Sequence, residues 1–272
     1  MTLPILNVLR IVKNSLSLFD QLCLEEALLR ADIKNWLVIS NVDIASTIEL
    51  ERKHSKYFSS PIIVLGVAGK LEKLVNIKLA TERGVTVIRR FTGGGTVVVD
   101  TGTLFASFII NKCDARPIMP LFPREIMRWS ADSVYTPVFD SIFGKGKFSL
   151  REHDYCWDDK KVGGNAQSVS RDRWVHHTSF LWSFDSQNME LLQMPEKRPE
   201  YRRSRPHSEF LIPLESLAKN NNVTRIDFVD AMLKKLSDDW DIRHVTLDEA
   251  REIELRPQAL ERKTNAYVSL LA

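Results

Sequence analysis

A glycine-rich stretch beside two arginines is the part of this sequence best suited to chemistry. An apolar run at residues 85–88 leads into Arg89 and Arg90, three glycines follow at 93–95, and three valines at 97–99. This pattern predicts strand, loop, strand. Contiguous glycines leave backbone N–H groups uncovered, and the arginines add charge-assisted hydrogen bonds, so the loop can hold a phosphate or carboxylate. A tight hairpin without a ligand is the alternative interpretation.

The two common nucleotide-binding loops do not match this stretch. A P-loop ends in Lys-Ser or Lys-Thr, which is missing here, and a Rossmann fingerprint needs spaced glycines that open a helix. The anion-binding hypothesis therefore depends on the bare backbone and on the arginine pair.

A lysine beside a second glycine pair is the other feature with chemical potential. Apolar and polar residues alternate over 154–167, which predicts a hairpin with its turn at 157–160 and with Lys161 at the start of the return strand. Because Gly163, Gly164 and Ala166 keep the backbone bare, a ligand can approach closely and Lys161 can reach it as a point charge. A solvated lysine at a turn is the alternative.

Two adjacent histidines, His176 and His177, follow at the start of a strand predicted over 180–184. Neighbouring strand residues face opposite sides, so the two imidazoles do not readily bind one ion, and we predict no metal site. The three cysteines lack metal-like spacing, and their odd number fits a reducing compartment.

Together these blocks resemble the lipoate-protein ligases, within the biotin and lipoate ligase superfamily. Residues 89–97 read RRFTGGGTV and are followed by Asp100 and Gly102, which is similar to the signature loop of that family. Residues 161–167 read KVGGNAQ and residues 176–179 read HHTS, in the family's order and spacing. The resemblance spans roughly residues 7–215.

The resemblance implies a fold and an activity. The fold is α+β, with a mixed, largely antiparallel sheet flanked by helices over residues 1–215 and a small helical C-terminal extension over 216–272. The activity is ATP-dependent: with ATP and Mg²⁺ the enzyme converts lipoate to lipoyl-AMP and then acylates a lysine. The expected partners are lipoyl domains of 2-oxoacid dehydrogenases or the glycine cleavage H protein. We expect a monomer, cytoplasmic if bacterial and mitochondrial if eukaryotic.

Carried over by position, the resemblance makes Lys161 the catalytic residue, against the activated acyl group and its phosphate. An ammonium there would stabilise both the oxyanion and the departing phosphate of acyl transfer. The resemblance places Leu22, Glu25 and Glu26 at a helical motif of the family, where we expect the carboxylates to be structural. The residues expected at the lipoyl-AMP site are Arg89, Arg90, Thr92, Gly93, Gly94, Gly95, Val97, Gly164, Asn165, Ala166 and His177.

This sequence departs from the family at three places. Val99 stands where the ligases have a histidine, Thr103 replaces an asparagine, and residues 67–70 replace an arginine and a Gln-Asn pair, with Lys70 as a substitute charge. Two alternatives therefore stay open: an ATP-independent octanoyl or lipoyl transferase, and a non-catalytic binding homologue. A transferase that forms a thioester needs a nucleophilic cysteine, for which Cys156 is the candidate.

Composition and charge limit the remaining function classes. The chain has 272 residues, 44% hydrophobic and 27% charged, which fits an ordinary globular protein without a membrane span. A net charge of +3 is mild, so no nucleic-acid partner is implied. The arginines of residues 194–215 are either a docking face for the acceptor or a solvated charged segment.

Periodicity and capping residues predict the elements that position these blocks. Residues 1–20 contain Arg10 and Lys13 and no acid before Asp20, so they form either a transit peptide or a strand followed by a capped helix. The predicted strands are 5–12, 35–40, 61–66, 104–110, 209–213 and 242–245. The predicted helices are 17–29, 71–82, 125–143 with an interruption at Pro137, 226–236, and one with a capping box at Thr246 and Glu249 that Pro257 breaks.

Overall fold

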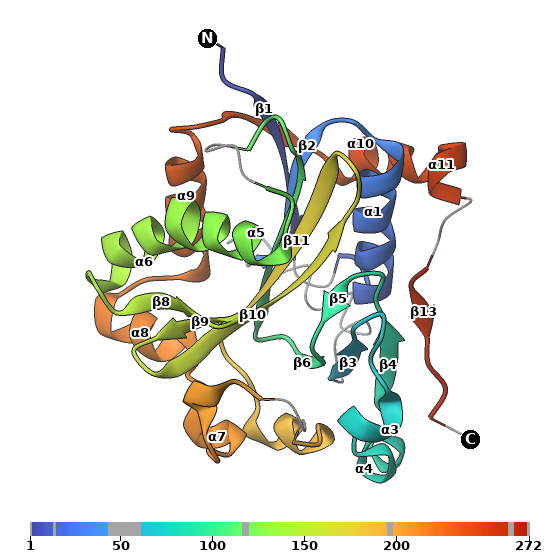
Figure 1. Cartoon of the computed structure of the whole chain (residues 1–272), viewed down its shortest axis with the longest axis vertical. Helices are drawn as coiled ribbons and strands as arrows, with labels where there is room; N and C mark the ends of the chain where they lie inside the picture. The colour runs from blue at the N-terminus through green and yellow to red at the C-terminus, as the bar shows by residue number, and fades with distance from the viewer. Residues whose placement is uncertain are drawn as a thin grey trace.

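Two β-sheets and the helices around them make up the fold of the computed structural model, which describes residues 2–12, 15–42, 61–115, 120–194, 198–260 and 264–270 (Figure 1). The larger sheet has the order β12-β1-β2-β7-β11-β10-β9-β8, and β5 pairs with β10. Among the described strand pairs of this sheet, β1–β2 and β1–β12 are parallel and the others are antiparallel. The predicted α+β fold with a mixed, largely antiparallel sheet is therefore confirmed. Its strands are β1 (Ile5–Val12), β2 (Asn35–Val42), β5 (Gly93–Gly94), β7 (Thr103–Asn111), β8 (Phe148–Arg151), β9 (Asp154–Trp157), β10 (Lys160–Val169), β11 (Arg173–Leu181) and β12 (Asp241–Val245).

The smaller sheet has the order β13-β4-β3-β6. Strands β3 and β4 are parallel, whereas β6 and β13 are antiparallel to their neighbours. The glycine-rich stretch leaves this sheet at the end of β4, contributes β5 to the larger sheet, and returns as β6. The predicted strand, loop, strand pattern is confirmed, and its loop joins the two sheets. The strands are β3 (Ile62–Leu65), β4 (Thr86–Arg89), β6 (Val97–Val99) and β13 (Ala266–Tyr267).

Helix α1 (Leu18–Ala31) packs against both sheets. Its N-cap is Ser17, whose hydroxyl accepts a hydrogen bond from the Asp20 N–H, as the sequence predicted. Leu24 and Leu28 pack on the larger sheet, while Leu18 and Leu22 share an apolar cluster with the smaller one. The helix therefore covers the place where the sheets meet.

The helical segment on the other face of the larger sheet departs from the prediction of one helix over 125–143. It consists of α5 (Pro123–Trp129), a π-helical stretch (Ser130–Tyr135) and α6 (Thr136–Phe143). Pro137 lies in the first turn of α6, directly after the π-helical stretch, and has no N–H to donate back into it. The interruption is thus the π-helical stretch that precedes the proline.

Three further expectations are corrected. The predicted helix 71–82 is split into α3 (Leu71–Leu74) and α4 (Ile77–Glu82), because Val75 between them pairs with Leu192 in an isolated β-bridge. Residues 209–213 are not a strand: α7 (His207–Phe210) ends there, and a single bridge joins Leu211 to Lys161. Strand β11 begins at Arg173, so both histidines lie within it and not at its start.

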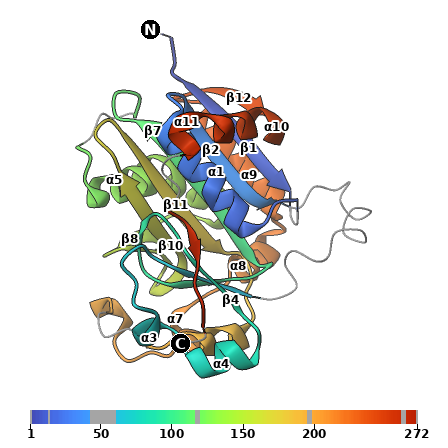
Figure 2. The ribbon, with the colours of Figure 1, turned by 90° about the vertical axis from the view of Figure 1, so that its right-hand side faces the viewer.

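Residues beyond 213 pack onto both sheets (Figure 2). Helices α8 (Leu214–Asn221) and α9 (Arg225–Leu236) contribute Leu214 and Phe228 to the main core, and β12 lies beside β1. The chain continues through α10 (Leu247–Arg251), with its predicted capping box, and α11 (Pro257–Leu260), which begins at Pro257. Strand β13 then joins the smaller sheet. Within the described residues, no helix is long and apolar enough to cross a membrane.

Candidate functional site

The glycine-rich loop and the second glycine block lie side by side. Gly93 and Gly94 pair with Gln167 and Ala166 of β10. Gly94 has a φ of 114°, and a Cβ there would lie 2.9 Å from the guanidinium of Arg90. A side chain at this position would therefore be strained as well as crowded, which explains the glycine.

The arginines beside the loop donate to backbone carbonyls. Arg90 is buried, and it donates from Nε to Thr92 Oγ1 at 2.9 Å and from Nη2 to Gly95 O at 2.7 Å. Arg89 donates from Nη1 to Gly69 O at 2.7 Å. Burial lowers the pKa of Arg90 to about 10, so the group remains charged at neutral pH. Both arginines shape the loops around the site, and their contact with a bound anion stays a prediction.

A narrow, mainly apolar pocket of about 30 Å³ lies between α1 and the two sheets. Pockets that bind small molecules commonly combine apolar surface with a few placed polar groups. The lining residues come from α1, from the smaller sheet with its loop, and from the larger sheet. They are Leu18, Gln21, Leu22, Glu25, Val64, Arg90, Val97, Phe105, Ser107, Asn165, Ala166, His177 and Ser179.

The two histidines face opposite sides of β11, as the strand alternation predicted. His177 lines the narrow pocket, where its Nε2 lies 2.9 Å from Glu25 Oε2 without the alignment of a hydrogen bond. His176 points into the core, where its Nε2 lies 2.8 Å from the Tyr155 hydroxyl. Burial lowers the pKa of His176 to about 3, so its imidazole is neutral. Glu25 lines the pocket, a position that the sequence did not reveal.

The Lys161 ammonium lines the two larger cavities beside the glycine-rich loop, outside the narrow pocket, and pairs with a carboxylate. Its Nζ is 2.6 Å from Asp154 Oδ1, and the Tyr201 hydroxyl donates to Asp154 Oδ2 at 2.9 Å. A Cβ on Gly164 would be only 3.3 Å from this Nζ, so the ammonium lies over bare backbone. Sequence reasoning missed Asp154, although the hairpin register could have revealed it. Lys161 pairs with Cys156, and Asp154, two residues before, is a diagonal neighbour on the same face.

Lys161 lies where two larger cavities meet. These cavities, of about 260 and 720 Å³, share a wall made by Gly95, Thr96, Val97, His153, Asp154, Lys161 and Gly164. Asp154 is the only carboxylate among the described residues that line them. His207 lines the smaller of the two, and its pKa is lowered to about 4 by burial and by the charges of Arg202 and Lys161. The junction therefore carries the Lys161–Asp154 ion pair, and the smaller cavity adds the imidazole of His207.

Most residues predicted for the lipoyl-AMP site line at least one of the three cavities. Those that do so are Arg90, Gly93, Gly94, Gly95, Val97, Gly164, Asn165, Ala166 and His177. Arg89 and Thr92 do not line these three cavities, and their hydrogen bonds hold the loops in place. The structure thus brings the three sequence blocks to one region, and what they bind stays a prediction.

Cys156, the candidate nucleophile, is completely buried beside the lysine. Its Sγ lies 3.2 Å from the Tyr201 hydroxyl. Burial raises the pKa of the thiol to about 11. Because the thiolate is the nucleophilic form, this environment is that of an inert cysteine.

The three departures from the family have different surroundings. Val99 is buried in the cluster with Leu18 and Leu22 of α1, so its side chain belongs to the core. Thr103 lines the 260 Å³ cavity. The carbonyls of Val67 and Gly69 accept hydrogen bonds from Arg89. Across the described chain, no group of three or more His, Cys, Asp or Glu residues is placed to hold a metal ion.

Comparisons with known proteins identify relatives. The model of the lipoyl protein ligase A/B catalytic domain matches residues 56–237. The inactive lipoate-protein ligase 2 of Plasmodium falciparum is 28% identical, over 84% of this chain and 68% of that protein. Lipoyl amidotransferase LIPT1 of human mitochondria is 26% identical, over 77% of this chain and 56% of that protein. Lipoate-protein ligase LplJ of Bacillus subtilis is 29% identical, over 48% of this chain and 36% of that protein. The chain thus spans about two thirds of the first relative and less of the others.

Solved structures share the fold. A bi-partite lipoate protein ligase from Thermoplasma acidophilum, studied with its E2 lipoyl domain, has a TM-score of 0.65 at 19% identity, over 96% of this chain and 92% of that one. P. falciparum LipL1 in complex with lipoate has a TM-score of 0.63 at 18% identity, over 95% of this chain and 70% of that one. Lipoate-protein ligase A bound with ATP has a TM-score of 0.63 at 15% identity, over 95% of this chain and 99% of that one.

Proposed function

The chain belongs to the lipoyl protein ligase A/B catalytic domain family, and we propose that it transfers a lipoyl or octanoyl group from an acyl adenylate to a lysine of a lipoyl domain. The observation that carries this proposal is the Lys161 ammonium, held by Asp154 over Gly164 where two cavities meet. We propose a lipoyl-type acyl group because the relatives are named lipoate-protein ligases. We propose a lipoyl domain as the acceptor because one structural neighbour was studied with its E2 lipoyl domain.

The three cavities suit the three parts of this reaction. The apolar pocket along α1 suits the acyl chain, and its volume of about 30 Å³ means that it must widen to admit one. The glycine-rich loop and Lys161 border both larger cavities, so the adenylate phosphate can lie there while the acceptor lysine enters beside it. The two acceptor classes we propose are lipoyl domains of 2-oxoacid dehydrogenases and the glycine cleavage H protein.

The transfer step requires a cation at the position of Lys161. The neutral acceptor amine attacks the acyl carbon, a C–N bond forms, the C–O bond to phosphate breaks, and AMP leaves as the amine releases its proton. Negative charge develops on the carbonyl oxygen and on the departing phosphate. A preorganised ammonium stabilises both charges, and the ion pair with Asp154 fixes its position before substrate binds.

Formation of the adenylate by the same chain is the second candidate. It is favoured by the fold shared with lipoate-protein ligase A bound with ATP over 95% of this chain. Mg²⁺ would accompany the ATP through the nucleotide phosphates, because Asp154, the one carboxylate that the described residues place in the walls of the two larger cavities, is already engaged by Lys161 and Tyr201. The buried Val99 and the relative named as inactive favour a chain that only uses or binds the adenylate.

Two parallel assays of the purified chain with an apo lipoyl domain test the proposal. One contains lipoyl-AMP, and the other contains ATP, Mg²⁺ and lipoate, with the mass of the lipoyl domain as the readout. We expect the acyl mass shift with lipoyl-AMP, and a shift in the second assay assigns adenylation to this chain as well. No shift in either assay overturns the catalytic proposal, and tight binding of lipoyl-AMP by calorimetry would then establish a non-catalytic binding homologue.

A further inference from the structure

A short segment at residues 264–270 joins helix α1 to the strand that enters the glycine-rich loop. Within it, β13 pairs with β4, so that Ala266 lies opposite Arg89, and Val268 donates its N–H to Val87 O at 2.9 Å. This segment lies outside residues 56–237, which match the family model. We call residues 264–270 the strap.

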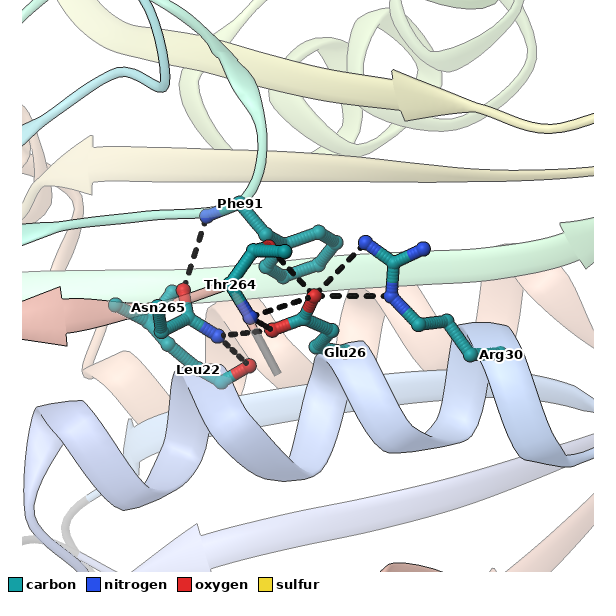
Figure 3. A network of polar contacts seen from close by, with 6 residues as sticks. All are labelled: Leu22, Glu26, Arg30, Phe91, Thr264 and Asn265. Carbon is teal, nitrogen blue, oxygen red and sulfur yellow. Dashed lines mark hydrogen bonds and ion pairs between the residues drawn. The ribbon is translucent and has the colours of Figure 1, made fainter. Parts of the chain in front are cut away.

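The strap completes the hydrogen bonds of a buried carboxylate on α1 (Figure 3). Glu26 is 2% exposed, and Arg30 donates to its Oε1 at 2.9 Å. Thr264 donates to the carboxylate from its backbone N at 3.0 Å and from Oγ1 at 2.6 Å, and Asn265 Nδ2 donates at 2.8 Å. A buried carboxylate is stable only when it is paired and hydrogen-bonded, so this contact fixes the strap to α1.

Asn265 carries the connection onward to the loop. Its Nδ2 also donates to Leu22 O at 3.1 Å, and its Oδ1 accepts from the Phe91 N–H at 2.9 Å (Figure 3). A flipped amide would set its NH₂ against the Phe91 N–H and its oxygen against the Glu26 carboxylate, so the network allows one orientation. One side chain therefore connects the backbones of α1 and of the loop entrance.

Both ends of this connection reach the narrow pocket. Leu22 lines it directly, and Phe91 follows Arg90, which also lines it. The Phe91 ring packs edge-on against His177, another lining residue, with ring centroids 5.6 Å apart. Because the pocket is only about 30 Å³ in volume, a small change in the separation of α1 from the loop changes its width substantially.

We infer that Asn265 is a positioning residue: by tying α1 to the entrance of the glycine-rich loop, it limits how far the pocket opens when it widens around the acyl chain. The identity of the ligand rests on the proposed function, whereas the connection itself rests on the hydrogen bonds. Without Asn265 the loop and α1 can separate beyond the width of the acyl chain, so the pocket walls contact the chain less closely and the acyl donor is bound less tightly.

Asn265→Ala and Tyr267→Ala form a matched pair for the test. Both variants alter the strap, but the Tyr267 ring stacks on Phe19, at a centroid distance of 4.2 Å, and neither ring lines the pocket. The readouts are amide hydrogen exchange of residues 91–97 in the free protein, the KM and kcat for lipoyl-AMP, and the Tm. Asn265→Asp is the reserve variant, because it keeps the shape and the acceptor for Phe91 but loses both donors on the α1 side.

We expect Asn265→Ala to accelerate exchange at residues 91–97 about tenfold and to raise the KM for lipoyl-AMP about fivefold or more. The kcat and the KM for the lipoyl domain should change much less, and Tyr267→Ala should leave all of these near wild type. The inference would be overturned if residues 91–97 of Asn265→Ala exchanged at the wild-type rate. It would also be overturned if both variants raised the KM for lipoyl-AMP in proportion to their decrease in Tm. A wild-type protein that binds no lipoyl-AMP contradicts the proposed function instead, and the exchange measurement still decides whether Asn265 holds the loop.

Discussion

Lys161 and Lys160 are neighbours in β10, yet their side chains have different surroundings. Lys161 pairs with Asp154 at the junction of two cavities, and its side chain is 23% exposed, whereas Lys160 is exposed near the turn. We expect Lys161→Ala to lower acyl transfer by two or more orders of magnitude, about 2.7 kcal/mol, because it removes the cation that meets the developing charge. Single-turnover transfer from lipoyl-AMP to an apo lipoyl domain measures this.

Lys160→Ala is the internal control for that experiment and should change the rate little. Side chains alternate along a strand, so the comparison separates a specific site from a general surface charge. Equal losses in the two variants would indicate a basic patch for the acceptor. An unchanged rate in both would remove the catalytic role of this block.

Cys156 is close to Lys161 in the hairpin but is a poor nucleophile. Its thiol is buried, lies beside the Tyr201 hydroxyl, and has a pKa raised to about 11. We therefore expect Cys156→Ser to retain most of the transfer activity, with no acyl-enzyme detectable by intact mass. Loss of activity in this variant, together with a thioester trapped on the wild-type chain, would instead support the cysteine route.

At the scale of elements, the π-helical stretch Ser130–Tyr135 packs against the buried side of β11. The Ser130 hydroxyl lies 2.6 Å from that of Tyr155 and 3.1 Å from His176 Nε2, and Gln167 Nε2 lies 3.0 Å from the other imidazole nitrogen. These partners hold a neutral imidazole in the core, because burial and the nearby His177 lower its pKa to about 3. The helix and the strand are thus joined by a group that resists protonation.

This histidine makes the stability of the fold depend on pH. Its pKa is about 3 in the folded chain and about 6.5 when unfolded, so between these values the unfolded state binds more protons. Its contribution is complete above about pH 6.5 and is lost as the pH falls toward 3, by up to about 1.4 kcal/mol per pH unit. Urea unfolding at several pH values should show a shallower pH dependence for His176→Gln than for wild type. Identical slopes would contradict this assignment.

At the scale of the whole molecule, residues beyond 215 are part of the main core. Phe228, Met232 and Trp240 are buried in the same cluster as the larger sheet, and β12 extends that sheet beside β1. Truncating a large core side chain costs about 3–5 kcal/mol, and a whole domain is stable by about 5–15 kcal/mol. We therefore expect a chain of residues 1–215 to lose cooperative folding, which near-UV circular dichroism and dye binding would detect. A cooperative melt of that fragment would instead support a separate extension over 216–272.

Features that arise within a few residues of one another could be predicted from the amino-acid sequence. The strand, loop, strand pattern around residues 93–95, the hairpin before Gly163 and the opposite directions of His176 and His177 all follow from side-chain alternation and glycine stereochemistry. The caps at Ser17 and Thr246 follow from local hydrogen bonding. The order of the three blocks was enough to predict the family that the comparisons then showed.

Which groups can contact a ligand depends on long-range packing, and the sequence did not reveal it. Arg90 donates to carbonyls of its own loop and of Val64, and the predicted helix 71–82 is interrupted where Val75 pairs with Leu192. The bond from Phe91 to Asn265 spans 174 residues. Such contacts depend on how distant segments are brought together, and no local pattern records that. Local backbone preferences therefore specified the parts of this site, while the packing of the two sheets, α1 and the strap specified their arrangement.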